Sequence, residues 1–227
     1  MANLVITIDG PAASGKSTAA RLLAERLGAS FLDTGAMYRA VTLAAIAAGV
    51  DMADEEQLLG VLEASEFQFT IKEGKMVVRI DGADVTEQIR RRRVTANARH
   101  IASAGKLRAK LVEMQRQFAA GQEKMVTEGR DQGTVAFPEA DMKFYLTAEP
   151  KERAKRRLAE LREAGGEENP EQIQKALEER DRQDETREIG PLAPADDAIV
   201  IDTTDLSIEE VVGELLCRVE EECLRKD

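Results

Sequence analysis

Short apolar runs alternate along the chain with longer segments in which apolar residues recur every three or four positions. The short runs are typical of strands, and the long periodic segments are typical of amphipathic helices. Five short runs stand between helical segments, at 4–8, 31–32, 125–128, 142–146 and 198–201. Strands that alternate with helices predict an α/β fold, with a parallel sheet covered by helices on both faces.

Capping signals mark the ends of several periodic segments. Gly28 follows the first of them and predicts a helix C-terminus. Asp54 with Gln57, and Ser207 with Glu210, have the spacing of a capping box at the start of two others. The expected helices are 17–27, 38–48, 54–64, 94–104, 107–120, 150–164, 171–187 and a last one from 207 onward.

One part of the chain departs from this alternation. Residues 67–71 and 76–80 have the period-two pattern of strands, and Gly74 between them is a turn signal. We expect a β-hairpin inserted as a small subdomain. A second irregular segment, the polar stretch 165–170, predicts a linker between two helices.

Composition excludes several classes of protein. Of 227 residues, 43% are hydrophobic, enough for a core, and the net charge of −11 disfavours a nucleic-acid polymer as partner. No apolar run is long enough to span a membrane, and the N-terminal MANLVITIDG does not resemble a signal peptide. Cys217 and Cys223 lie six apart, on different faces of a helix, which favours neither a zinc site nor a redox pair. We expect a cytoplasmic protein in a reducing environment.

The clearest motif is GPAASGKS at 10–17, which matches G-x-x-x-x-G-K-[ST]. In this motif the glycines let backbone N–H groups surround phosphates, Lys16 bridges the β- and γ-phosphates, and the Ser17 hydroxyl binds Mg²⁺. The helix that follows directs its N-terminal dipole at the same anion. A strand before the motif and a helix after it are the context that it requires. The sequence therefore predicts a P-loop NTPase-type fold with a sheet of about five strands and a loop that binds nucleotide phosphates.

A phosphate loop alone is compatible with a kinase, a GTPase, an ATP-driven motor or an ATP-operated switch. The sequence contains no N-K-x-D guanine signature, and the chain is short for a motor domain. His100 is the one histidine, and we expect it at the surface or in packing. The charged residues elsewhere must decide the class.

Arginines gather on two predicted helices. Arg153, Arg156 and Arg157 are spaced to share one helix face. On the next helix an apolar stripe continues into Arg180, Asp184 and Arg187, which indicates a charged cleft with the carboxylate holding the arginines. The alternative is an exposed face with weak ion pairs.

Further charged residues stand near the ends of other predicted elements. Glu128 and Arg130 lie where a strand ends, which is where α/β sheets bind ligands. Glu128 is a candidate for orienting water around Mg²⁺, and Arg130 for binding an anion. The run 90–93, RRRR, is expected to be solvated.

Together these residues resemble the bacterial cytidylate kinases, a group of nucleoside monophosphate kinases. The resemblance runs along nearly the whole chain and includes the GRD-x-GTV-x-FP-like segment, which generic nucleoside monophosphate kinases lack. The matching stretches are ITIDGPAASGKST at 6–18, FLDTGAMYRA at 31–40, EGRDQGTVAFPEAD at 128–141, ERAKRR at 152–157, EERDRQDETR at 178–187 and PLAPADDAIVIDTTDLSIEEVV at 191–212.

The resemblance implies a reaction, an organisation and a set of roles. The reaction is phosphoryl transfer from ATP to CMP or dCMP, with Mg²⁺. The chain would be a single kinase domain with a core (1–36, 105–150, 190–227), a monophosphate-binding subdomain that holds the β-rich insert (37–104) and a helical lid (151–189).

The implied ATP-binding residues are Gly10, Pro11, Ala12, Ala13, Ser14, Gly15, Lys16, Ser17 and Thr18, with Ser17 on the metal. The implied acceptor-binding residues are Thr34, Arg39, Arg99, Arg108, Arg130, Asp131, Arg180, Asp184 and Arg187. The implied catalytic residues are Lys16, Arg130, Arg153, Arg157 and Arg187, of which Arg153 and Arg157 belong to the lid. A monomer that acts on small molecules is expected.

One departure from the family pattern bears on the base. Arg99 stands where the family has a serine expected to touch cytosine, and Gly105 stands where it has a proline. Arg99 could favour uracil, leave cytosine preferred, or turn to solvent while Arg108 and Asp131 discriminate. A kinase for another acceptor such as UMP, or a non-catalytic ATP-operated switch, remain alternatives.

Overall fold

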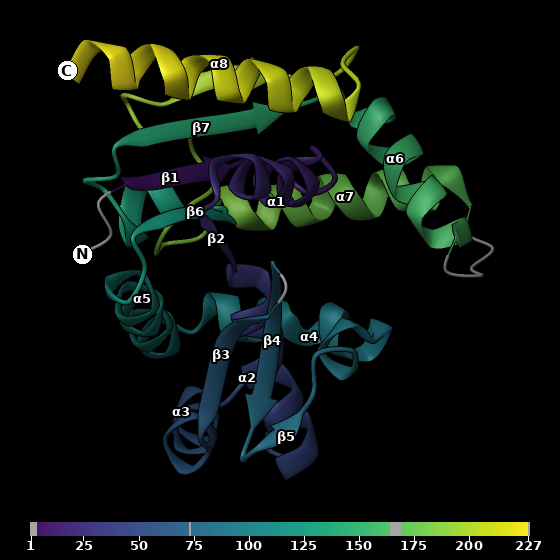
Figure 1. Ribbon diagram of the computed structural model, residues 1–227. Coiled ribbons are helices and arrows are strands. Elements are labelled where there is room, and N and C mark those ends of the chain that lie inside the picture. Colours follow the sequence, from purple (N-terminus) through teal and green to yellow (C-terminus); the bar gives the residue numbers. More distant parts are fainter. Residues whose placement is uncertain (1–3, 73, 164–168, 227) are drawn as a thin grey trace.

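Five parallel strands form the central sheet of the computed structural model, which describes residues 4–72, 74–163 and 169–226 (Figure 1). The predicted parallel α/β sheet is confirmed, because every neighbouring pair of strands in this sheet runs parallel. The carboxyl ends of the strands therefore lie along one edge. In spatial order the strands are β2 (Ser30–Asp33), β6 (Lys124–Gly129), β1 (Leu4–Asp9), β7 (Met142–Thr147) and β8 (Ile199–Asp202).

Consecutive strand residues point to opposite faces of the sheet, and helices cover both faces. On one face Phe31 and Val126 pack with α1 (Lys16–Leu27) and α8 (Ile208–Lys226). On the other face their neighbours Leu32 and Met125 pack with α5 (Gly105–Ala120) and α2 (Thr34–Ala48). The period of two in strands thus divides the apolar residues between two cores.

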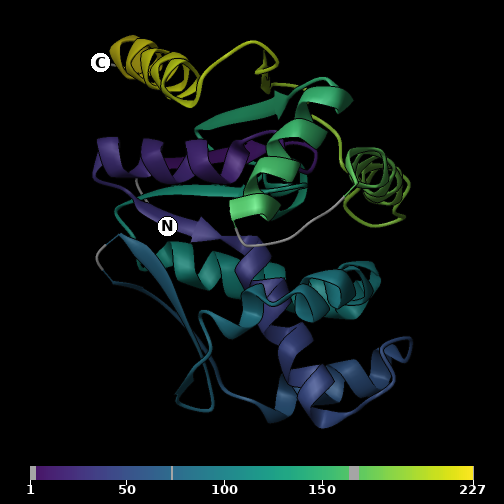
Figure 2. The same cartoon turned by 90° about the vertical axis from the view of Figure 1, so that its right-hand side faces the viewer.

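A smaller subdomain, built on a second sheet, lies beside the main sheet and contains the predicted hairpin (Figure 2). β3 (Phe67–Lys72) and β4 (Lys75–Ile80) pair antiparallel, and β4 also pairs with β5 (Ala83–Asp84). The two-residue β5 was not predicted, because so short a strand shows no periodicity. The sheet packs in one core with α2, α3 (Glu55–Ala64), α4 (Arg92–Ser103), α5 and the 3₁₀ turn η1 (Gln88–Arg90).

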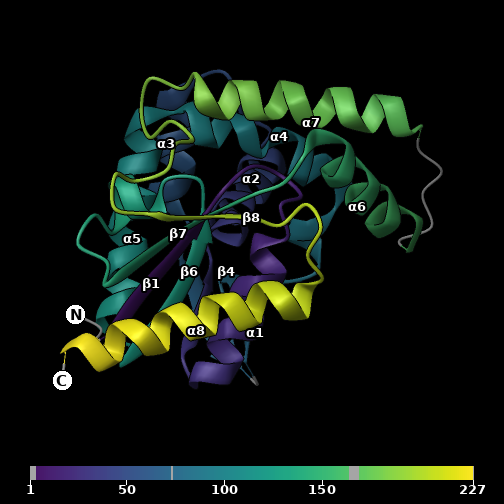
Figure 3. The same ribbon diagram turned by 90° about the horizontal axis from the view of Figure 1, so that it is seen from above.

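Two further helices, α6 (Pro150–Glu163) and α7 (Pro170–Glu185), pair at the end of the sheet where the phosphate loop lies (Figures 1 and 3). Leu158 of α6 and Leu177 of α7 form a small core that includes Ala12 of the loop. The predicted linker lies largely outside the described residues. Asn169 is described, and its side chain caps α7 by accepting from the Glu171 N–H at 2.8 Å.

Several element boundaries differ from the predicted ones. α2 begins at Thr34 rather than at residue 38, because the Asp33 side chain caps it by accepting from the Ala36 N–H at 2.8 Å. α7 ends at Glu185, before Arg187. A π-helical turn, η2 (Gln132–Ala136), follows β6 and was not predicted. Both capping boxes are confirmed, with Gln57 N to Asp54 at 3.1 Å and Ser207 N to Glu210 at 2.8 Å.

Among the described residues, no helix has both the length and the apolar character needed to cross a membrane.

Candidate active site

The phosphate loop connects the carboxyl end of β1 to α1, as its motif predicts. Gly10 has φ +148°, and a Cβ there would meet the Leu146 carbonyl oxygen at 2.0 Å. Gly15 has φ +86° and caps α1 without any side-chain hydrogen bond. The N–H groups at the start of α1 therefore have no side chain that competes with an anion.

Lys16 is the first residue of α1, and its side chain is buried. Its Nζ donates to the Pro11 carbonyl at 3.1 Å, across the loop. Burial and the positive charge of Arg130 lower the pKa of Lys16 to about 7, while Glu128 and Asp184 oppose this shift. A polyphosphate would supply the negative charge that favours the protonated amine.

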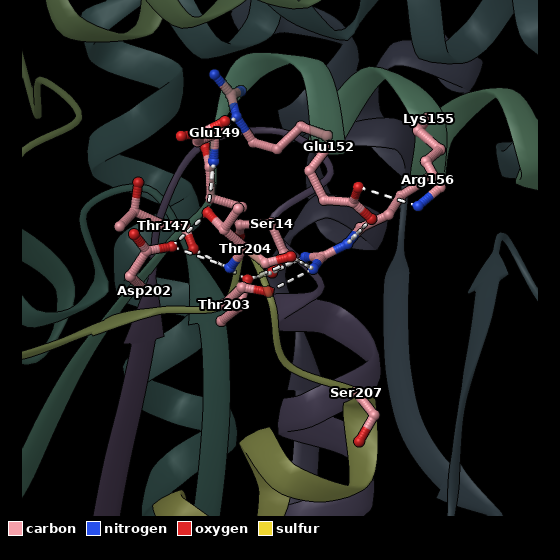
Figure 4. Close-up of polar contacts among 12 residues, drawn as sticks. Ser14, Thr147, Glu149, Glu152, Lys155, Arg156, Asp202, Thr203, Thr204 and Ser207 are labelled. Carbon is pink, nitrogen blue, oxygen red and sulfur yellow. Dashed lines mark hydrogen bonds and ion pairs between the residues drawn. The ribbon is translucent and has the colours of Figure 1, made fainter.

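A second group of contacts holds the outer side of the loop (Figure 4). Arg156 of α6 donates to Thr203 Oγ1 at 2.9 Å and to the Ser14 carbonyl at 3.5 Å. The Thr203 hydroxyl also lies 3.2 Å from the Ser14 carbonyl and 2.9 Å from the Thr147 carbonyl. These contacts join the loop to β7, to α6 and to the segment after β8. Sequence reasoning missed Thr203, because a threonine that follows a strand carries no distinguishing signal.

Arg153 and Asp181 form a buried ion pair between α6 and α7. Arg153 also donates to the Ala12 carbonyl at 3.1 Å, and Asp181 accepts from the Ala12 N–H at 3.1 Å. Both side chains therefore contact the backbone of the phosphate loop. Arg157 is half-exposed and pairs with Glu160 at 2.7 Å. The three arginines that share a predicted face of α6 thus have three different surroundings.

A cluster of charged side chains lies across the same edge of the sheet, at the end of β6. Arg130 Nε donates to Asp184 at 2.9 Å, and Arg187 lies 3.5 Å from the same carboxylate. Asp184 was expected to hold Arg180 and Arg187, and it contacts Arg187; its hydrogen-bonded partner is Arg130, which was not part of that expectation. Desolvation and the positive charge of Arg130 lower the pKa of Arg180 to about 10, although Arg180 is exposed at the protein surface.

A buried ion pair between Arg108 and Asp131 stands next to this cluster. Arg108 comes from α5, lies 5.9 Å from the centre of the Tyr38 ring and donates to the Ala102 carbonyl at 3.1 Å. Burial raises the pKa of Asp131, against the nearby positive charges of Arg108 and Arg187. Arg99, in contrast, is exposed on α4, and no partner for it is found among the described residues.

The start of α2 adds further polar side chains to the same edge of the sheet. Thr34 Oγ1 donates to the Glu128 carbonyl at 2.7 Å, which places the helix start beside β6. Asp33 pairs with Arg39 at 3.1 Å and with Arg90 at 3.5 Å. The four arginines at 90–93 are exposed, as expected, but Arg90 also pairs with the Asp33 carboxylate.

Several buried polar atoms in these groups have no hydrogen-bond partner. They are the Nε atoms of Arg39, Arg108 and Arg187 and the Oγ of Ser14. Buried donors without partners cost free energy unless a ligand satisfies them. The arrangement can therefore bind one polyphosphate at the loop and a second anionic or polar molecule between Arg39, Arg108, Arg130 and Arg187.

Comparisons with known proteins identify the family of this chain. The family model for cytidylate kinase matches residues 6–221. The chain belongs to the cytidylate kinase family. A cytidylate kinase from Pelotomaculum thermopropionicum is 47% identical over 215 residues, covering 94% of this chain and 95% of that protein. One from Caldicellulosiruptor saccharolyticus is 44% identical over 216 residues, covering 95% of each.

A solved structure of a more distant protein shares the fold. A crystal structure of an uncharacterized protein from Eubacterium ventriosum aligns with a TM-score of 0.52 at 12% identity, covering 96% of this chain and 99% of that one. Membership of the cytidylate kinase family thus rests on sequence, and the fold is also found in a protein of low identity.

Proposed function

We propose that this member of the cytidylate kinase family transfers the γ-phosphoryl group of ATP to CMP or dCMP and forms ADP and CDP or dCDP. The proposal is carried by the two anion-binding groups on one sheet edge, namely the phosphate loop with Lys16 and the Arg130–Asp184–Arg187 cluster beside it. A phosphoryl transferase needs both, because the donor and the acceptor each bring phosphate to the site.

On the donor side, the residues from Gly10 to Thr18 would bind the ATP phosphates. Lys16 would bridge the β- and γ-phosphates and offset the charge that develops on the moving group. Arg153 would act through the loop backbone that it contacts at Ala12. Arg157, which is half-exposed, would reach the phosphates when α6 and α7 close over the loop. Closure excludes water, which would otherwise accept the phosphoryl group.

On the acceptor side, Arg39, Arg130, Arg180 and Arg187 would bind the monophosphate, with Thr34 near it. Asp184 would orient the arginines and accept a sugar hydroxyl. The Arg108–Asp131 pair would face the cytosine, where the Asp131 carboxylate can accept from the 4-amino group. Arg99 would contribute only if its exposed side chain turned inward.

The chemistry needs no general base. A phosphate monoester is largely dianionic at neutral pH, because its second pKa is about 6, so an acceptor oxygen can attack in line without losing a proton. His100 has no partner in the site. Positioning and electrostatic stabilisation by Lys16 and the arginines then supply most of the rate.

The donor set fits Mg²⁺. Ser17 offers an exposed hydroxyl at the start of α1, and Glu128 offers a carboxylate at the end of β6; both are the hard oxygen donors that Mg²⁺ prefers. Among the described residues no group of three or more acidic, Cys or His side chains could hold a metal alone. A cation shared with substrate phosphates needs few protein ligands, and it would neutralise phosphate charge.

We propose that the enzyme is a monomer and that it acts in the cytoplasm.

The test is a coupled assay with ATP and Mg²⁺ against CMP, dCMP, UMP, AMP and GMP. We expect turnover with CMP and dCMP to exceed that with the other acceptors. Lys16→Ala should fold but lose about 10²–10³-fold in rate, the usual effect of removing one preorganised electrostatic contact. ATP binding without turnover on any acceptor would instead identify an ATP-operated switch, and a preference for UMP would identify a different kinase.

A further inference from the structure

The π-helical turn η2 directly follows the two residues that would face the acceptor, Arg130 and Asp131. The Asp131 carbonyl itself accepts the first bonds of the turn, from Val135 N at 2.9 Å and from Ala136 N at 3.1 Å. The backbone that carries the Asp131 side chain is therefore part of the turn. Any shift of the turn must move Asp131 relative to Arg108.

The N-terminal end of the turn is held by a buried carboxylate. Asp9, the last residue of β1, accepts from Gln132 N at 2.9 Å and from Gly133 N at 2.8 Å. The turn also approaches β1 closely, since a Cβ on Gly133 would meet Thr7 Oγ1 at 3.0 Å. A hydrogen-bond acceptor at this end satisfies the N–H groups that the turn leaves free.

The C-terminal end of the turn is held by an arginine that no part of the proposed reaction uses. Arg116 Nε donates to the Ala136 carbonyl at 2.8 Å, and its Nη2 donates to the Val135 carbonyl at 2.9 Å. The planar guanidinium thus binds two successive carbonyls at once, which a lysine ammonium on a single stem does with poorer geometry. The turn is therefore held by a buried carboxyl group at its start and by a guanidinium at its end.

Arg116 and Arg108 both lie on α5, eight residues apart, which is about 12 Å along a helix. Arg108 binds the Asp131 side chain at one end of the segment 131–136, and Arg116 binds its carbonyls at the other. α5 thus contacts this segment at two points. If the contact made by Arg116 is lost, η2 is free to move away from α5 while Arg108 stays in place.

We propose that Arg116 is a positioning residue for acceptor recognition. It holds η2 against α5 and thereby keeps Asp131 and Arg130 correctly placed relative to Arg108. This inference rests on the proposed function, in which these residues bind the acceptor. Arg116 acts through the turn and touches no substrate. Its side chain is largely exposed, so its removal should leave the cores of the protein intact.

The experiment compares Arg116→Met with Arg116→Lys and with Lys110→Met, an exposed cation on the same helix. Methionine, lysine and arginine have similar helix propensity, so α5 should persist in all three. Hydrogen exchange is measured on peptides that span 130–137, and the Kd values of CMP and of ATP are measured by calorimetry. We expect Arg116→Met to speed exchange in this segment and to weaken CMP at least fivefold, with ATP within twofold. Arg116→Lys should fall between it and wild type, and Lys110→Met should match wild type.

Two results would overturn the inference. One is exchange in Arg116→Met that equals wild type, which means that the arginine does not hold the turn. The other is equal weakening of CMP and ATP, which means general destabilisation rather than positioning. If the wild-type protein binds no CMP, the proposed function and the role in acceptor recognition are both wrong, and the exchange measurement then decides only whether Arg116 holds the turn.

Discussion

The Nε atom of Arg130 donates to Oδ2 of Asp184 over 2.9 Å, and this ion pair ties the end of β6 to α7. Arg187 approaches the same carboxylate from the residues just after α7. One side chain thus connects the central sheet to the helices that lie beside the phosphate loop. Asp184 therefore connects the proposed acceptor site to the α6–α7 pair.

Asp184→Ala should impair use of the acceptor more than binding of ATP. Without the carboxylate, Arg130 and Arg187 lose their common partner, and a sugar hydroxyl loses its acceptor. We expect a raised KM for CMP, a lowered kcat or both, with the Kd of ATP within a few-fold in calorimetry. Glu179→Ala, on an exposed part of the same helix, is the control and should leave all three unchanged. A collapse of ATP binding with normal acceptor parameters would show that Asp184 belongs to the donor side.

The sequence alone predicted the parts of this site that follow from local patterns. The phosphate loop has a fixed spacing, and helical periodicity placed Arg180 and Asp184 on one helix. Arg187, predicted on the same helix, lies after its end at Glu185. The charges at Glu128 and Arg130 could be assigned to the site because parallel strands end at a common edge.

The parts that could not be predicted depend on contacts between distant segments. Arg153 and Asp181 meet over the Ala12 backbone from two helices, and nothing in the spacing of either helix indicates this. The π-helical turn depends on Asp9, which lies 123 positions before Gln132. Arg90 was expected to be merely solvated, because a run of four arginines gives no hint that one of them turns back to Asp33.

The proposal that Arg108 and Asp131 discriminate the base can be tested directly. The structure favours Arg108 with Asp131, because both are buried at the site while Arg99 is exposed on α4. Asp131→Asn replaces an acceptor of the cytosine amino group by a side chain that can also donate to the O4 of uracil. We expect the ratio of kcat/KM for CMP to that for UMP to fall by about tenfold, roughly 1.4 kcal/mol. Arg99→Ser should change this ratio by less than about twofold; a larger change would return the discrimination to Arg99.

The buried carboxyl of Asp9 should make stability depend on pH. Burial raises the pKa of Asp9 to about 7, against hydrogen bonds from Gly133 and Gln132; Asp131 adds to the rise and Arg130 opposes it. Between about pH 4 and pH 7 the unfolded chain releases this proton and the folded protein keeps it, so rising pH favours the unfolded state. The contribution of Asp9 to the free energy of unfolding should fall by at most about 1.4 kcal/mol per pH unit in this window.

Urea denaturation of wild type and Asp9→Asn at pH 4.5, 5.5 and 6.5 isolates this contribution, because the asparagine does not titrate. The stability of wild type relative to the variant should decrease as pH rises. A difference that stays constant would mean that Asp9 is already ionised at pH 4.5.

The backbone conformation at Gly190 leaves room for the Arg108–Asp131 ion pair. Gly190 has φ +59°, and a Cβ there would lie 2.3 Å from both Arg108 Nη2 and Asp131 Oδ2, the two atoms of the buried ion pair. Gly28 has the same φ of +59°, and a Cβ there would meet nothing within 4 Å, so Gly28→Ala imposes the same backbone strain without a clash. The left-handed backbone alone should cost each alanine variant about 1 kcal/mol of stability, because an L-residue disfavours that region, and the clash at Gly190 should add to this cost. Only Gly190→Ala should also push Arg108 and Asp131 apart, raising the KM for CMP while the KM for ATP changes little. Equal effects of the two variants on CMP would mean that the ion pair tolerates the methyl group and that the acceptor site does not depend on its geometry.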